Sequence, residues 1–481
     1  MLDREESPTS IDGVEVVPAS ERRRLARVRW SAALSALVVG LNLSVMNVAV
    51  ADLRSSFPDA AFTTIGWVVS AYTIVFGAVL VPAGRLADKL GRRSVFMTGL
   101  AAFATGSLVA GVAPALWVLI AGRAVQGIGA ACLTPSSMAL LLDATPVPQR
   151  AAATSFFSGV SSIGAATGPS LGALAIDASS WRLAFFLGLP VLAVSYLLGR
   201  RSLPASVPVR DAALPDLAGS LLVMVAMTAL SFGIVQGRTW GWSHAGVLGA
   251  FALAAVLIPL FVWRCTRHPS PVMAIGLFRG RSFAAANAAA LLFGMATGGV
   301  ALANVLFLRD VWGYSLVGAG FGALPASLAA MAAARFVGRA GVRRGEVAVG
   351  VPGALCIAAA LLWMRVFVDA DARYWTTWLP ASVLLGYGIA ASFPMIAVAV
   401  VRGIGSDELS LASATNRTFL QVGNAIGIAI VVAVLGNVVG SDALSDFRVA
   451  WLVLAALAVS CACAVAVAGS SRRSPVAAAA T

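Results

Sequence analysis

Apolar runs of roughly 20 residues recur from one end of this chain to the other, and each could cross a hydrocarbon core about 30 Å thick. The 481 residues are 59% hydrophobic and only 11% charged. A typical soluble domain is about a quarter charged. The strands of a membrane β-barrel would alternate polar and apolar residues, which these runs do not do. The sequence therefore predicts an all-α polytopic membrane protein.

The runs predict fourteen transmembrane helices. The first run, which starts at Trp30, is too long for the apolar region of a signal peptide and lacks a small-residue cleavage site, so we expect it to remain as a span. Residues 1–28 and 471–481 are expected to be a disordered N-terminal segment and a tail. The predicted spans lie near residues 29–50, 64–84, 94–113, 115–140, 153–175, 183–199, 215–235, 246–264, 283–306, 314–335, 347–367, 376–400, 411–437 and 449–469.

Basic residues are distributed unevenly between the two sides of these spans. About 26 of the 34 lysines and arginines fall in segments on the side of the N-terminus. The positive-inside rule assigns that side to the cytoplasm, and an even number of spans places both termini there. We therefore interpret the net charge of +13 as membrane topology rather than nucleic-acid binding. The expected location is the inner (plasma) membrane.

The chain offers little for enzymatic chemistry. The five cysteines include no CxxC pair, and Cys461 and Cys463 point to different helix faces, so neither a disulfide nor a metal site is expected. His244 and His268 both fall in loops. The only lysine, Lys89, is not followed by the Ser or Thr of an ATP-binding loop. We expect no enzyme activity and no cofactor, which leaves secondary transport or a facilitated pathway.

The segment GRLADKLGRR, residues 84–93, follows the second span. We expect its first glycine to end the helix, its second to make the turn, and its acid to form an Asp–Arg contact that breaks when the spans move. A basic loop that merely obeys the positive-inside rule is the alternative. The segment resembles the signature G-x-x-x-D-[RK]-x-G-[RK]-[RK] of the major facilitator superfamily. The matching residues, which the resemblance implies act in conformational gating, are Gly84, Asp88, Lys89, Gly91, Arg92 and Arg93.

Span four carries GRAVQGIGAA, in which Arg123 and Gln126 are three residues apart and share a helix face. Arg123 lies well inside the predicted span, where an arginine costs at least about 2.5 kcal/mol, so we expect it to be functional. The stretch resembles the R-x-x-Q-G element of the superfamily. That resemblance implies a role in proton-coupled transport.

Span five carries GAATGPSLGA, with glycines at 164, 168 and 172. A glycine every four residues forms a smooth stripe where another helix can approach closely, and Pro169 permits a bend. A generic packing face would explain the stripe equally well. The pattern also resembles the antiporter motif G-x-x-x-G-P-x-x-G-G, with Ala173 in place of the last glycine. The resemblance implies export, with roles for Gly164, Gly168, Pro169 and Gly172.

The number of spans suggests two six-helix halves, 29–199 and 266–470, separated by a loop and two inserted helices at 200–265. The segment RFVGRAGVRRG after span ten occupies the place of the loop after span two but lacks its acid, as in a faded internal repeat. PDLAGSLLV, QGRTWGW, WRLAFFLGLPV and NRTFLQVGNAIG resemble the fourteen-span drug:proton antiporter family. This resemblance implies a major facilitator fold. It also implies a protein that exports drugs by proton antiport through alternating access.

The first span departs from this family. The family has an aspartate in L-D-x-T-x-V-N-V-A-L-P, whereas this chain has LNLSVMNVAVA, which places Asn42 at the aspartate's position. The resemblance implies that Asn42 faces the cavity and Arg123. Asn47 lies about 140° away on the helix and is expected to make a packing contact. The acids Asp52, Asp177 and Asp310 lie at the outer ends of spans, and Asp88, Asp143 and Asp216 at the inner ends.

The cavity is therefore expected to hold a permanent positive charge, Arg123, with no carboxylate opposite. We predict neutral or anionic substrates rather than lipophilic cations. Asp52, Asp143 or Asp177 could carry the proton, or an acidic substrate could supply it. The residues expected to bind substrate or couple transport are Asn42, Arg123, Gln126, Gln421, Asn424, Tyr72 and Trp67, and Asn304 and Phe393 are further candidates for the cavity lining.

Three functions remain open on this basis. The leading hypothesis is a monomeric exporter of drugs or secondary metabolites, with the lipid bilayer around it and protons as coupling ions. A dedicated exporter of one metabolite, lipid or amino acid, which need not be proton-coupled, fits the same motifs. A non-transporting sensor on a transporter fold is the third reading.

Overall fold

The computed structural model describes residues 19–146, 149–203, 215–273, 275–402, 404–405, 408–435 and 443–470. Nearly all of these residues are helical, and the described ranges contain no β-strand. Within the described ranges, fourteen helical segments are long and apolar enough to cross a membrane. The predicted all-α architecture with fourteen spans is therefore confirmed.

Several spans are built from two helical pieces: α6 and α7 form the sixth, and a helical turn precedes α14 in the twelfth. In chain order the elements are α1 (Ala19–Ser56), α2 (Phe62–Leu90), α3 (Arg92–Gly111), α4 (Leu116–Asp143), α5 (Arg150–Ala178), α6 (Trp181–Phe186), α7 (Leu189–Ser202), α8 (Leu217–Trp240), α9 (Ala245–Arg267), η2 (Ile275–Arg279), α10 (Arg281–Asp310), α11 (Leu316–Gly322), α12 (Leu324–Arg344), α13 (Glu346–Phe367), η3 (Tyr374–Trp378), α14 (Leu379–Val401), α15 (Leu409–Leu435) and α16 (Ala443–Ser470).

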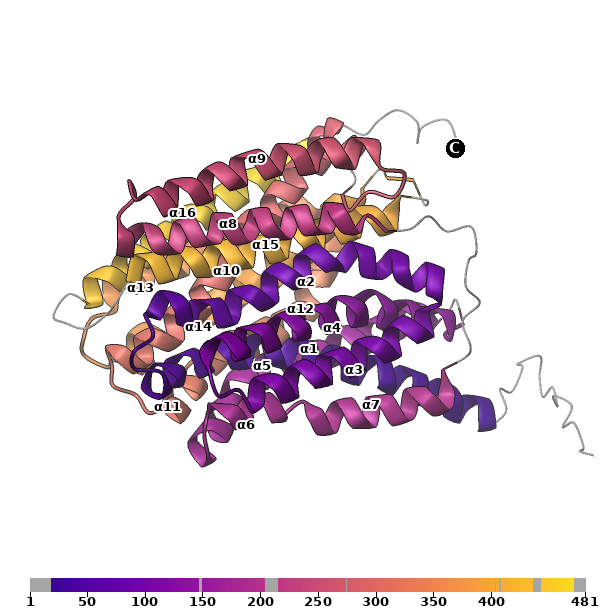
Figure 1. The fold of residues 1–481 in the computed structure, drawn as a ribbon, viewed down its shortest axis with the longest axis horizontal. Helices are drawn as coiled ribbons and strands as arrows, with labels where there is room; N and C mark the ends of the chain where they lie inside the picture. The colour runs from indigo at the N-terminus through magenta and orange to yellow at the C-terminus, as the bar shows by residue number, and fades with distance from the viewer. Residues whose placement is uncertain are drawn as a thin grey trace, which may run out of the picture.

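The helices pack in two groups with the same internal pattern (Figure 1). In the first group α1 packs on α5, α3 on α4 and α2 on α4. In the second, α10 packs on α15, α13 on α14 and α12 on α14. Helices α2 and α15 join the groups, and α8 lies against both of them with α9 outside it. This repeated pattern supports the proposed division into two halves with two inserted helices, whose boundaries remain predictions.

The glycines of α5 face α1. A Cβ added at Gly164 would lie 2.2 Å from the backbone oxygen of Leu37, and one at Gly168 would lie 2.6 Å from Ser44 Cβ. The backbones of α1 and α5 thus approach so closely that only glycine fits. In the second group Gly427 of α15 has the same relation to α10, since its added Cβ would lie 2.0 Å from the oxygen of Met295. The corresponding helix pair is thus packed in the same way in each half.

Two sequence predictions about helix ends are wrong. Helix α2 does not end at Gly84 but continues to Leu90, because residues 85–90 (RLADKL) include no helix breaker. Gly91 alone makes the turn into α3, with a φ of 94° that favours glycine. Residues 19–28, expected to be disordered, belong to α1, where the Nε of Arg24 donates to the backbone oxygen of Ser202 at 3.3 Å. The predicted tail 471–481 and residues 1–18 lie outside the described residues.

Both described ends of the chain, Ala19 and Ser470, lie at one end of the bundle, which we call the terminal end (right in Figure 1). At the opposite end the two halves are held together. Arg54 of α1 forms an ion pair with Asp310 of α10 at 2.9 Å, and Gly320 of α11 packs against the backbone of Pro169 in α5. The two halves therefore meet firmly at the opposite end of the bundle.

Candidate functional site

A polar cluster centred on Arg123 lies inside the first half. The Arg123 side chain, on α4, is fully buried. Its Nε donates to the backbone oxygen of Val68 at 2.8 Å, and its Nη1 donates to Gln126 Oε1 at 2.8 Å. The Gln126 amide in turn donates to Ser107 Oγ of α3 at 2.8 Å. Helices α2, α3 and α4 thus hold the guanidinium in one orientation.

Asn42 and Tyr72 complete this cluster. Arg123 Nη1 donates to Asn42 Oδ1 of α1, and the guanidinium carbon lies 4.3 Å from the centroid of the buried Tyr72 ring. An aromatic face attracts a cation without neutralising it. Every described partner of Arg123 is neutral, and the described ion pairs lie elsewhere. The cluster therefore keeps a net positive charge.

Two donors in this cluster are unused. Among the described residues, Arg123 Nη2 and the Tyr72 hydroxyl are buried and have no hydrogen-bond partner. A buried donor without a partner costs about 1–3 kcal/mol, and more when it is charged. An acceptor supplied by a substrate would remove this cost. The side chain of Asn47, expected to make a packing contact, lies outside the described residues.

A second polar group lies on α15. Asn424 Nδ2 donates to Gln421 Oε1 at 3.1 Å, and the Gln421 Nε2 donor is buried without a partner among the described residues. One turn away, Thr418 Oγ1 donates to the backbone oxygen of Gly77 in α2 at 3.1 Å. This group connects the two halves, and its described hydrogen bonds are separate from those of Arg123.

The described hydrogen bonds link none of the remaining predicted lining residues to either group. Trp67 is half-buried on α2. Asn304 Oδ1 accepts a hydrogen bond from Trp451 Nε1 at 3.2 Å, which joins α10 to α16. Phe393 is exposed and stacks on Phe293, with ring centroids 5.9 Å apart. For Asn304 the structure therefore shows a hydrogen bond between helices.

A cavity of about 570 Å³ opens at the terminal end between α2, α4 and α15. Gly84, Asp88 and Arg92 line one side of it, and Arg417 of α15 lines the other. Thr134 of α4, which also lines the cavity, is eleven residues from Arg123, or about 16 Å along the helix. The cavity therefore runs between the halves from the terminal end but does not reach the Arg123 cluster in this conformation.

The junction of α2 and α3 lies beside this cavity. Arg92 pairs with Asp143 at the end of α4 at 2.5 Å and with Asp88 at 3.6 Å. Arg93 Nη2 donates to the backbone oxygen of Arg200 at 3.0 Å, and Lys89 is half-buried. The structure thus brings Asp88 together with Arg92 and adds Asp143, which lies far from them in sequence.

The second half repeats this junction with the charges reversed. Gly345, with a φ of 87°, ends α12 as Gly91 ends α2. The next residue, Glu346, pairs with Arg402 after α14. The segment after span ten thus lacks an acid at the position of Asp88, as predicted, but has one at the start of the next helix.

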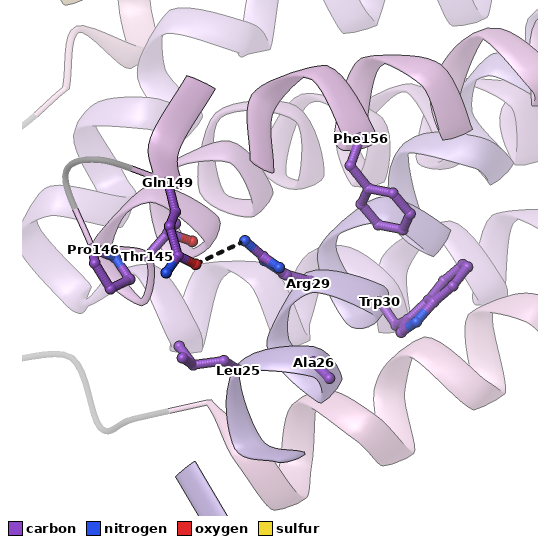
Figure 2. Close-up of a pocket in the computed structure, with 8 residues that line it drawn as sticks. All are labelled: Leu25, Ala26, Arg29, Trp30, Thr145, Pro146, Gln149 and Phe156. Carbon is purple, nitrogen blue, oxygen red and sulfur yellow. Dashed lines mark hydrogen bonds between the residues drawn. The ribbon is translucent and has the colours of Figure 1, made fainter. Parts of the chain in front are cut away.

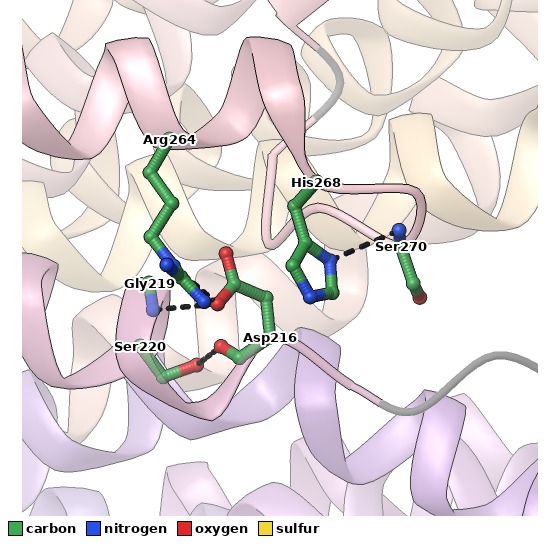
Figure 3. A network of polar contacts seen from close by, with 6 residues as sticks. All are labelled: Asp216, Gly219, Ser220, Arg264, His268 and Ser270. Atoms are coloured by element: carbon green, nitrogen blue, oxygen red, sulfur yellow. Dashed lines mark hydrogen bonds and ion pairs between the residues drawn. The ribbon is translucent and has the colours of Figure 1, made fainter.

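Two further features lie at the terminal end. A smaller cavity of about 460 Å³ lies between α1, the connection from α4 to α5, and α5 itself (Figure 2). The inserted helices are tied together by Asp216, whose Oδ1 accepts from the backbone N–H of Gly219 at 2.8 Å and from Arg264 Nε at 2.7 Å (Figure 3). The Asp216 side chain is fully buried. This contact fixes the start of α8 to the end of α9.

Sequence reasoning missed several of these participants. Val68 contributes through its backbone oxygen, and no residue type signals that role. Ser107 and Thr418 are ordinary hydroxyl residues in apolar helices, where most hydroxyls bond to their own helix. The sequence predicts Tyr72 as a site residue, but the position of its ring over the guanidinium depends on how α2 packs against α4.

The chain belongs to the major facilitator superfamily, since the superfamily model matches residues 32–428. With fourteen candidate spans, it is a multi-pass membrane protein of that superfamily. The predicted family resemblance and fold are thereby confirmed.

Two relatives of this chain carry names that refer to antibiotics. The methylenomycin A resistance protein of Streptomyces coelicolor is 32% identical over 424 residues, which cover 87% of this chain and 88% of the relative. The cephamycin export protein CmcT of Amycolatopsis lactamdurans is 30% identical over 438 residues, 89% of each chain. Among solved structures, an auto-inhibited POT family peptide transporter has a TM-score of 0.69 and 15% identity over 94% of this chain and 98% of its own. This last likeness concerns the fold alone.

Proposed function

We propose that this protein is a secondary efflux transporter that exports small neutral or anionic organic molecules, such as antibiotics or secondary metabolites, by alternating access. Membership in the superfamily and relatives named for methylenomycin A resistance and cephamycin export support export of such compounds. The glycine contacts between α1 and α5, in the segment that resembles the antiporter motif, agree with this proposal.

The neutral surroundings of Arg123 carry the proposal on substrate charge. Asn42 occupies the position where the related family has an aspartate, and it accepts a hydrogen bond from the guanidinium. A monovalent cation about 8 Å from an uncompensated positive charge is repelled by about 2 kcal/mol at an effective dielectric constant near 20. An anionic or neutral acceptor would instead find the free donors of Arg123 and Tyr72.

Coupling to protons needs a titratable group, and the Arg123 cluster as described contains no carboxylate. Asp143 is engaged with Arg92, whereas Asp52 is half-buried near the end of α1 and Asp177 is exposed near the end of α5. We propose that Asp52, Asp177 or an acidic substrate carries the proton if transport is coupled. Uncoupled export of a single metabolite is the second candidate function. Asn42 favours it, because an amide at the position of the related family's aspartate cannot carry a proton.

We assign the terminal end to the cytoplasm, because the segments at that end carry most of the basic residues. The cavity between α2, α4 and α15 then faces the cytoplasm, from which an exporter takes its substrate. The proposed location is the inner (plasma) membrane, with a monomer as the working unit and no enzymatic activity.

Purified protein in proteoliposomes tests this proposal. We expect uptake into inverted vesicles of an anionic or neutral aromatic antibiotic and weak transport of a cationic dye. Robust transport of the dye alone would refute the charge preference, and net flux that ignores an imposed pH gradient would refute obligatory antiport. Arg123→Ala should abolish the resistance of a host carrying the gene. Unchanged resistance would favour a non-transporting sensor.

A further inference from the structure

The smaller cavity at the terminal end has a mixed character. On α1 its lining residues Leu25, Ala26, Arg29 and Trp30 follow each other on one helix face, and Phe156 of α5 lies opposite (Figure 2). The Trp30 and Phe156 rings meet edge to face, with centroids 5.0 Å apart. The cavity thus has an aromatic wall on one side and a guanidinium in its interior.

The guanidinium of Arg29 makes only a weak hydrogen bond at this site. Its Nη2 donates to Gln149 Oε1 at 3.5 Å, the outer limit of a hydrogen bond. The other lining residues, Thr145 and Pro146 among them, are all uncharged, so none provides a carboxylate. The cavity therefore offers a cation and an amide that an anionic group could engage together.

The cavity also lies at the depth of lipid headgroups. The apolar run of α1 begins at Trp30, which is 48% exposed, as is typical of tryptophans at a membrane interface. From Phe156 an open strip continues along α5 toward the membrane interior. A Cβ added at Gly159 would meet no atom within 4 Å, and Ile163 is exposed one turn further on. An apolar chain could extend along this strip.

We propose that this cavity binds the headgroup of an anionic phospholipid. The phosphodiester would accept from the Arg29 guanidinium and the Gln149 amide, and an acyl chain would lie along the Phe156–Ile163 face. A cationic pocket between transmembrane helices on the cytoplasmic side suits such lipids. This site is distinct from the Arg123 cluster and independent of what the protein transports.

Native mass spectrometry of the delipidated full-length protein tests this inference with palmitoyl-oleoyl-phosphatidylglycerol as the probe. Arg29→Gln should raise the dissociation constant for this lipid about fivefold, since one arginine near an anionic headgroup contributes about 1 kcal/mol to binding. Arg27→Gln is the matched control, because it removes the same charge from an exposed position two residues away that does not line the cavity. Trp30→Ala should also weaken binding without altering charge.

The comparison of lipids separates the alternatives. We expect the zwitterionic phosphatidylcholine to bind more weakly and millimolar inorganic phosphate not to displace the bound lipid. Equal losses from Arg29→Gln and Arg27→Gln would overturn the proposal in favour of diffuse surface charge. Displacement by inorganic phosphate would overturn it in favour of a site for free anions, and equal affinity for both lipids would remove the role of the anionic headgroup.

Discussion

Asn42→Asp is the most informative substitution at the Arg123 cluster. The new carboxylate would replace the amide oxygen that now accepts from Arg123 Nη1, with almost no change in shape. The carboxylate would also form an ion pair with the guanidinium, so that donor and acceptor of this hydrogen bond would both be charged. The substitution should therefore be tolerated and should cancel the net positive charge of the cluster.

The expected change in substrate preference follows from this cancellation. Removal of a repulsion of about 2 kcal/mol, for a cation about 8 Å away, corresponds to a gain of about thirtyfold for cations relative to neutral substrates. The substitution also adds a carboxylate to a site that has none among its described residues. Transport by the variant should thus become more dependent on an imposed pH gradient than transport by the natural protein.

Transport of a cationic dye and of an anionic antibiotic would be measured in proteoliposomes, with and without a pH gradient. Asn424→Asp is the matched control, because it adds a carboxylate to α15, where Asn424 bonds to Gln421 rather than to Arg123. If Asn42→Asp changed neither the substrate ratio nor the gradient dependence, Arg123 would not set the charge preference. An equal effect of Asn424→Asp would show that any buried acid suffices.

Three further predictions concern packing and ion pairs. Gly164→Ala should lower the melting temperature by the equivalent of about 1–3 kcal/mol, because its Cβ would lie 2.2 Å from a backbone oxygen of α1. Gly159→Ala should leave the melting temperature unchanged, because open space surrounds that position. Equal melting temperatures for the two variants would contradict the close packing of α1 and α5. Arg92→Glu should reduce the transport rate strongly but stability only slightly, since a partly exposed ion pair contributes only about 0.2–1 kcal/mol. The double variant Arg92→Glu with Asp143→Arg should recover transport, because it restores the ion pair with the charges exchanged. No recovery of transport in the double variant would count against a gating role. Asp216→Asn should destabilise the protein by about 1–3 kcal/mol through loss of a buried charged acceptor, and an unchanged thermal melt would exclude this role.

The fold could be predicted because its strongest constraint is local. An apolar run of sufficient length must become a membrane helix, since no other structure satisfies its backbone in lipid. Helix ends near the interface lack this constraint. For this reason the sequence predicts a helix end at Gly84, although α2 continues for six more residues, and predicts disorder for residues 19–28, which belong to α1. At these positions a glycine or a charge is compatible with either state.

The candidate site was predictable only in part. Arg123 stood out because a charge inside a span is costly, and Gln126 followed from its spacing on the same helix. The contact between Arg123 and Asn42 came from resemblance, since 81 residues separate them. The role of Asp143 at the α2–α3 junction could not be read from sequence, because the contact depends on where α4 ends relative to α3.

The two junctions at the terminal end differ in a way that bears on gating. In the second half Glu346 starts α13 and its partner Arg402 follows α14, so each charge is favoured by the dipole of the adjacent helix. In the first half Arg92 starts α3 and Asp143 ends α4, so both charges oppose the helix dipoles, and Arg92 divides its contacts between two acids. Dipole contributions of about 0.3–1 kcal/mol per charge are comparable to the strength of an exposed ion pair. The α2–α3 junction of the first half is therefore the weaker of the two. Its residues Asp88 and Arg92 also line the cavity between the halves. We infer that this junction rearranges when the cavity closes.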